Sequence, residues 1–122
     1  VEIAYSYYAQ TADGTVCHFG DLEEIYDNGV REDTDGWRAG EDGHVPGIAM
    51  PGSPAVGGRF TRYFHADDGV ESGEVTAVGA ETVTPAGTFA DTLTVLEEGP
   101  SVKKYARDVG EIFDDGLELV SY

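Results

Sequence analysis

The sequence predicts an all-β protein, an antiparallel sandwich or a curved half-barrel with little or no helix. Apolar and polar residues alternate with a period of two along most of the chain, as in half-buried strands. No ten-residue window carries a convincing apolar stripe of helical spacing. Asp or Asn precedes Gly at six places that favour tight turns: Asp13-Gly14, Asn28-Gly29, Asp35-Gly36, Asp42-Gly43, Asp68-Gly69 and Asp115-Gly116.

In the first part of the chain, alternation begins at Val1 and predicts a strand over residues 1–10. A second strand is predicted over residues 15–19. Apolar residues on both sides of Asp27-Asn28-Gly29 are typical of a hairpin with a type I′ turn. The stretch 21–26 is the one place where a single helical turn is predicted.

The second part contains the remaining predicted strands, which cover residues 59–65, 75–84, 88–96, 102–113 and 117–122. Pro85 and Gly87 predict a reversal between two of these strands, after which Phe89 faces the core. The segment 45–58 breaks the pattern because it holds three prolines, which cannot donate to a sheet ladder. It predicts one long Pro/Gly-rich ordered loop or a crossing at a sheet edge.

The charge of the chain is extreme, with 24 acidic residues against 7 basic ones and a net charge of −17 on 122 residues. Such a surface repels itself, so it needs high salt or bound cations. It also repels phosphate, which argues against nucleic acid and anionic membranes as partners. The length favours a single β domain over 1–122, and no apolar stretch reaches the roughly 20 residues that span a bilayer.

Four spaced segments carry a resemblance to a known family. They read YSYYAQTADGTVCHFGD, WRAGEDGHVPGIAMPGSPAVGGRF, TPAGTFADTLTVLEE and KKYARDVGEIF. In this order they resemble an uncharacterised family of secreted bacterial and archaeal β-rich proteins, for which no activity is established. The resemblance covers nearly the whole chain. Cys17-His18 and Arg107-Asp108 depart from the usual family pattern.

The resemblance implies a secreted or cell-surface location. Family members carry further β-type sequence upstream, which implies that this chain is the C-terminal part of a larger domain. The chain also begins at Val1 rather than at Met, so we expect an upstream segment. The strand at Val1 would then need that segment, or another copy of the chain, to cover its edge.

Acidic clusters at residues 32–36 and 65–68, and a comparable one at Glu41-Asp42-Gly43, predict oxygen ligands for a hard cation such as calcium. Asp33 and Asp35 alternate before Gly36, like the opening of a calcium loop, but the acidic residue that an EF-hand needs further downstream is lacking. His65, Asp67 and Asp68 form the second cluster and are candidate ligands for calcium or for a transition metal. The alternative is that Asp favours turns and that excess acid only solvates the surface.

Other reactive or aromatic residues are less distinctive. Cys17 and His18 are neighbours in a predicted strand, so their side chains point to opposite faces and cannot form a thiol–imidazole pair. Trp37 lies beside the first acidic cluster, where it suits sugar stacking or peptide docking, with core packing as the alternative. There is no phosphate-binding loop, nucleophile elbow or zinc-protease helix.

Three functional hypotheses follow. The leading one is a non-enzymatic, salt-adapted acidic β domain that acts in binding or assembly, with calcium as its candidate cofactor and cations as its partners. The second is an extracellular subunit that assembles with other copies by β-strand addition. The third is a metal-assisted hydrolase built around His65, Asp67 and Asp68, which requires His18 or His44 to converge on that cluster.

Overall fold

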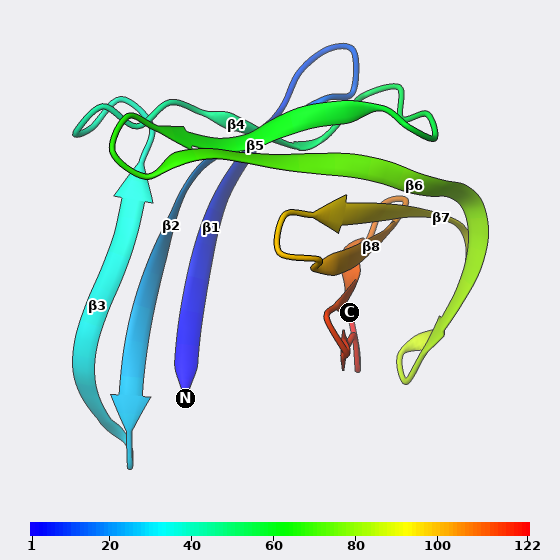
Figure 1. Ribbon diagram of the computed structural model, residues 1–122. Coiled ribbons are helices and arrows are strands. Elements are labelled where there is room, and N and C mark those ends of the chain that lie inside the picture. Colours follow the sequence, from blue (N-terminus) through cyan, green and yellow to red (C-terminus); the bar gives the residue numbers. More distant parts are fainter. The chain divides into compact units, whose positions relative to one another are not determined.

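The computed structural model describes all residues from 1 to 122 and confirms the all-β prediction, with ten strands, no helix and two antiparallel sheets (Figure 1). No helix in the chain is long and apolar enough to cross a membrane. The chain divides into two compact units. Unit 1 consists of Val1–Ser53 and Thr61–Val70, and unit 2 consists of Pro54–Phe60 and Glu71–Tyr122.

The first sheet has four strands, and its centre is the long β2. The strands are β1 (Glu2–Gln10), β2 (Val16–Asp27), β3 (Val30–Arg38) and β4 (Gly47–Met50). One edge of β2 pairs with β1 along its length, whereas the other edge pairs with β3 beyond Gly20 and with β4 before it. β3 and β4 therefore lie end to end along the same edge of β2.

The predicted hairpin is confirmed, since Asn28 and Gly29 have φ angles of 49° and 81°, the positive values that a type I′ turn requires. The predicted helical turn at 21–26 is wrong. These residues continue β2, which pairs with β1 on one side and with β3 on the other, so their backbone groups are bonded within the sheet.

The interpretation of residues 32–36 as the start of a calcium loop is also wrong, because these residues form the middle of β3. Alternate residues of a strand point to the same face, so Asp33 and Asp35 share one face of the first sheet. The strand carries few apolar side chains and is exposed along almost its whole length, so it lacks the hydrophobic alternation by which strands are recognised.

The Pro/Gly-rich segment forms the short edge strand β4, in agreement with the predicted edge crossing. A Cβ atom added at Gly47 would lie only 1.7 Å from the backbone oxygen of Arg62. Gly47 is therefore required by the close approach of a neighbouring backbone, and not by a turn.

The second sheet has the order β10-β9-β8-β7-β6-β5, with β6 curving strongly along its length (Figure 1). Its strands are β5 (Arg59–His65), β6 (Gly69–Thr84), β7 (Gly87–Glu97), β8 (Val102–Ala106), β9 (Gly110–Asp114) and β10 (Leu117–Glu118). β5 covers the residues predicted for it. The single strand predicted over 102–113 is wrong, because a turn with Asp108 at φ 61° divides it into β8 and β9.

The buried hydrophobic side chains all belong to unit 2. They are Val75, Phe89, Leu93, Val95, Tyr105, Ala106 and Ile112. Phe89 faces this core as predicted, directly after the β6–β7 turn, and packs with Ala106 and Ile112. Thr92 is also fully buried, and its hydroxyl is bonded to the Thr82 hydroxyl at 3.0 Å and to the Ala80 carbonyl at 2.9 Å.

Candidate functional site

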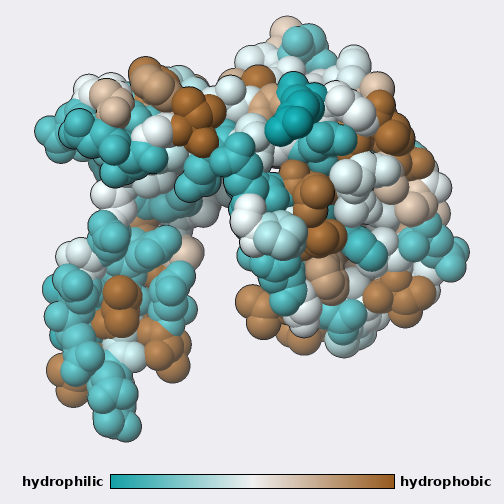
Figure 2. All heavy atoms as spheres, in the orientation of Figure 1, coloured by the Kyte–Doolittle hydropathy of each residue, from teal (hydrophilic) through white to brown (hydrophobic).

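Unit 1 differs from unit 2 because none of its hydrophobic side chains is fully buried. Figure 2 shows hydrophilic residues over most of the visible surface of the β2–β3 hairpin, with isolated hydrophobic side chains between them. The side chains of β1 are exposed along the whole strand. β1 and β3 therefore present their side chains to solvent, whereas most residues of β2 and β4 are half-buried. The composition of the two faces of this sheet decides what it can bind.

One face of the first sheet is acidic. Directly paired residues of neighbouring strands lie on the same face, and the pair Glu23–Asp35 places two carboxylates side by side. We call this the acidic face, with its carboxylates at Glu2, Asp21, Glu23, Asp33 and Asp35. Like charges directly opposite each other on two strands destabilise the sheet. The opposite face carries Ile3, Tyr5, Tyr7 and Leu22.

A continuous series of aromatic and imidazole rings crosses the acidic face, and we call it the ring row. Its members are Tyr8, His18, Trp37, His44, Tyr63 and His65. Ring centroids are 4.9 Å apart for Tyr8–His18, 5.1 Å for His18–Trp37, 5.2 Å for Trp37–Tyr63, 5.5 Å for Trp37–His44 and 4.2 Å for His44–His65. The row brings together all three histidines and the single tryptophan of the chain.

Asp21 holds the two central rings in place. One of its oxygens is 2.9 Å from Nε2 of His18, and the other accepts a hydrogen bond of 3.2 Å from Nε1 of Trp37. The neighbouring Gly20 lets β3 approach, since a Cβ there would lie 2.3 Å from the Trp37 carbonyl oxygen. β2 thus supplies both the hydrogen-bond acceptor for Trp37, at Asp21, and the space for its backbone, at Gly20.

Tyr63 and Asp68 link the other histidines. The Tyr63 hydroxyl donates to Asp68 at 2.9 Å and lies 3.2 Å from Nδ1 of His44. Because the hydroxyl has only one hydrogen, this arrangement makes His44 the donor to Tyr63. His65 is bonded through Nε2 to the Asp42 carbonyl at 2.9 Å, and its Nδ1 lies 3.2 Å from Asp68.

This environment favours the protonated form of His65. Its pKa is raised mainly by the hydrogen bond to the Asp42 carbonyl, against the opposing effect of burial, and further by the charges of Asp68 and Asp67. Protonated His65 therefore stabilises the folded chain. This contribution is fully present below the ordinary histidine pKa of about 6.5 and is lost as the pH rises through the raised value.

We expect the melting temperature to fall as the pH rises from about 6 to about 9, and the fall to be smaller in His65→Gln. Circular dichroism at constant ionic strength measures both profiles. The control is Glu118→Gln, which removes an exposed charge on β10 and should keep the wild-type slope. A wild-type melting temperature that stays constant or rises over this pH range contradicts the stabilisation that we assign to protonated His65.

Two neighbouring hollows, with volumes of about 340 and 330 Å³, lie against Trp37, and we call them together the Trp37 hollow. Both are lined by Asp21, Asp35, Trp37 and His44. The other charged or aromatic lining residues are Glu23, Arg38, Glu41, Asp42, Tyr63 and Asp68. The hollow thus has six carboxylates and a single guanidinium, so it attracts cations.

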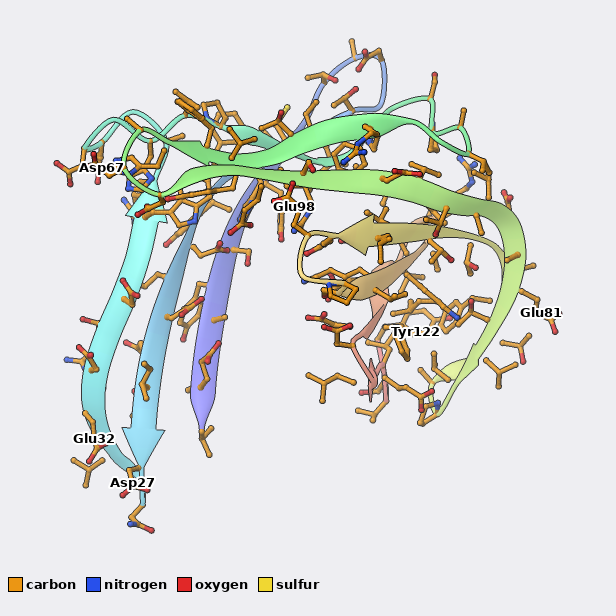
Figure 3. The ribbon with its side chains drawn as sticks, in the orientation of Figure 1. Asp27, Glu32, Asp67, Glu81, Glu98 and Tyr122 are labelled. Atoms are coloured by element: carbon orange, nitrogen blue, oxygen red, sulfur yellow. The ribbon has the colours of Figure 1, made fainter.

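The structure brings His65 and Asp68, two of the five predicted metal ligands, to within 3.2 Å of each other, but it does not group all five. Asp35 and Asp68 line the Trp37 hollow, and His65 lies in the ring row. Asp33 is on the acidic face nearer the hairpin end, opposite Ile25. Asp67 points outward at the β5–β6 turn, far from the labelled residues Asp27 and Glu32 at the hairpin end (Figure 3).

No group of three or more His, Cys, Asp or Glu side chains in the chain is placed to hold a metal ion. His44 does converge on His65, as the hydrolase hypothesis requires, but both ring nitrogens of His65 already lie against acceptor oxygens. Cys17 is half-buried and is not among the residues that line the Trp37 hollow. The calcium site remains a prediction.

Sequence reasoning missed the roles of Asp21 and Glu23, and it named His44 only as a possible metal ligand, without placing it or Tyr63 beside Trp37. Asp21 and Glu23 alternate in β2, and this spacing would have placed them on one face if the strand had been recognised past residue 19. No local signal marks His44 and Tyr63, because they meet Trp37 only through the tertiary fold.

Comparisons of the chain with protein-family models, with curated proteins and with solved structures found no match. The resemblance to a family of secreted proteins therefore stays a prediction. The geometry of the acidic face, the ring row and the Trp37 hollow is the basis on which a function can be proposed.

Proposed function

We propose that this chain is a non-enzymatic, salt-adapted acidic β domain, secreted or at the cell surface, that acts by binding. Its binding site is the Trp37 hollow, where cations gather and a ligand contacts the ring row. The observation that carries this proposal is that four acidic residues line each part of the hollow together with Trp37 and His44, two rings in contact with each other. Hollows of a few hundred cubic ångströms lined by aromatic rings and a few polar groups are typical of ligand sites.

The ring row is not part of a closed core, which supports binding. Tyr8 is exposed and the other five rings are half-buried, on a face of a sheet whose hydrophobic side chains all remain partly exposed. The rings are held in place by hydrogen bonds to Asp21 and Asp68, so they are ordered before any ligand arrives. Such preorganisation lowers the entropic cost of binding.

Calcium is the inorganic cation that we propose for the same face. Asp35 lies opposite Glu23, and Asp33 follows on the same face of β3, so a hard cation would relieve the repulsion between these oxygens. Self-assembly by strand addition is the second candidate. It is supported by the position of β1 at the edge of its sheet, where backbone groups are open to another strand.

Collisional quenching of Trp37 emission tests the proposal, because Trp37 is the only tryptophan. At low and constant ionic strength we expect caesium to quench Trp37 at least about 3-fold better than iodide, each scaled to its quenching of a blocked tryptophan amide. The reason is that the carboxylates concentrate cations and exclude anions. Equal scaled quenching by the two ions contradicts a site that gathers cations.

The matched variants are Asp35→Asn and Glu118→Gln, which each remove one negative charge. Asp35 lines the Trp37 hollow, whereas Glu118 is exposed on β10. Only Asp35→Asn should reduce the preference for caesium. Equal reductions by both variants would show that the preference reflects the net charge of the whole chain and not the hollow.

A further inference from the structure

The polar atoms of Trp37 and Tyr63, the two large rings that line the Trp37 hollow, are already bonded within the protein. Nε1 of Trp37 already donates to Asp21 at 3.2 Å, and the hydroxyl of Tyr63 donates to Asp68 at 2.9 Å. Both rings are half-buried and line the hollow, so what they still provide there is the exposed part of each π system. Aromatic surfaces of this kind attract cations and apolar groups.

Glu23 adds an uncompensated charge beside these rings. Its side chain is half-buried and makes no hydrogen bond or ion pair with a protein group, while Asp35 lies directly opposite on β3. Burial raises the pKa of Glu23 above its usual value, and the charges of Glu2, Asp21 and Asp35 raise it further. A cation bound between Glu23 and Asp35 would compensate both carboxylates.

The dimensions of the hollow favour an organic cation over a bare ion. Each part has a volume of 330 to 340 Å³, at the lower end of the range for small-molecule sites. The lining carboxylates are spread around this volume, and no three of them are grouped for a metal ion. A ligand with an alkyl stem and a charged head fills more of such a space than a single ion.

We propose that the Trp37 hollow binds a protonated alkylamine or guanidinium group, with its charge between Glu23 and Asp35 and its stem against the faces of Trp37 and Tyr63. This inference rests on the proposed function and names the chemical class of its ligand. The charged head makes hydrogen bonds to the carboxylates, and cation–π contact adds to them. A lysine or arginine side chain of a peptide and a free amine share this chemistry.

Titration of Trp37 emission at constant ionic strength tests the inference. The probes are n-butylammonium, Nα-acetyl-lysine amide, n-butanol, potassium and calcium. We expect a saturable change with the two amines and none with n-butanol. Tighter binding of the lysine amide indicates a peptide side chain as the source, whereas equal binding indicates a free amine.

Glu23→Gln and Asp35→Asn should each weaken n-butylammonium binding roughly 5-fold, whereas Glu118→Gln should leave it unchanged. Near-ultraviolet circular dichroism shows whether each variant keeps its ring packing. If Glu23→Gln unfolds, Asp35→Asn still tests the inference, because Asp35 is at an exposed position. The expected outcome is weakening by either folded variant.

An equal response to n-butanol or to potassium overturns the organic-cation inference. Suppose that potassium or calcium changes the emission as much as n-butylammonium does, and that caesium still quenches Trp37 better than iodide. The proposed cation-binding function then stands, and only the organic-cation inference falls. If no probe changes the emission and caesium has no advantage over iodide, both proposals fall together.

Discussion

Replacement of Gly47 by alanine is expected to unfold unit 1, with a loss of at least about 3 kcal/mol in the free energy of unfolding. The added Cβ would lie 1.7 Å from the backbone oxygen and 2.4 Å from the backbone carbon of Arg62. A backbone carbonyl held in a strand cannot swing aside as a flexible side chain can. Such a loss is a large part of the stability of an ordinary small domain.

Gly29→Ala is the matched control for this substitution. Gly29 has a φ angle of 81° but nothing within 4 Å of an added Cβ, so alanine there introduces backbone strain without a clash. We expect it to cost about 1 kcal/mol. Urea unfolding measures both losses, and near-ultraviolet circular dichroism reports on the Trp37 environment. Similar losses for the two variants contradict the close approach at Gly47.

Strands and turns were predictable from the sequence where the signal lies in adjacent residues, as alternating apolar and polar side chains or as turn-forming pairs. The strand Arg59–His65 alternates large apolar residues with polar ones, and its limits follow from the pattern. The β2–β3 turn follows from Asn28-Gly29, because Gly and Asn are among the few residue types that adopt positive φ at low cost. These signals depend on neighbouring residues alone, so the sequence is enough to recognise them.

The β3 strand was not predictable by the same reasoning. Its residues are polar and exposed, and it forms because β2 offers it a bonded edge rather than because it buries a hydrophobic face. The division between β8 and β9 was missed for another reason. It depends on Asp108, a residue other than glycine, adopting a φ angle of 61°.

The candidate site depends on a β-bulge that sequence patterns do not reveal. In a regular ladder Tyr8 would pair with Phe19, since Tyr7 pairs with Gly20. An extra residue in β2 instead places His18 opposite Tyr8, and a shift of one residue exchanges the two faces of a strand. The ring row therefore begins at an irregularity whose position is set by the tertiary fold.

The second large effect expected is a strong dependence of stability on salt. The net charge of −17 lies on a chain in which carboxylates such as Glu23 and Asp35 face each other directly. Screening acts over about 30 Å at 0.01 M salt but over about 3 Å at 1 M, so repulsion on the acidic face largely disappears at high salt. We expect the melting temperature to rise by at least about 10 °C between these concentrations of potassium chloride.

Two controls separate the sources of this stabilisation. Calcium chloride at matched ionic strength should exceed potassium chloride if the acidic face binds calcium specifically, and Asp33→Asn should reduce that excess. A melting temperature that is independent of protein concentration excludes self-assembly through the β1 edge as the source. Chloride salts are preferred because sulfate stabilises most folded proteins by exclusion from their surfaces.

The measurement that most directly tests the account is therefore thermal unfolding by circular dichroism across a potassium chloride series at fixed pH. We propose that the carboxylates of the acidic face are tolerated because dissolved cations gather among them. We therefore expect a steep rise of the melting temperature with salt, and a shallower rise when Glu23→Gln and Asp35→Asn are combined. A melting temperature that stays constant or falls as potassium chloride is added would contradict it.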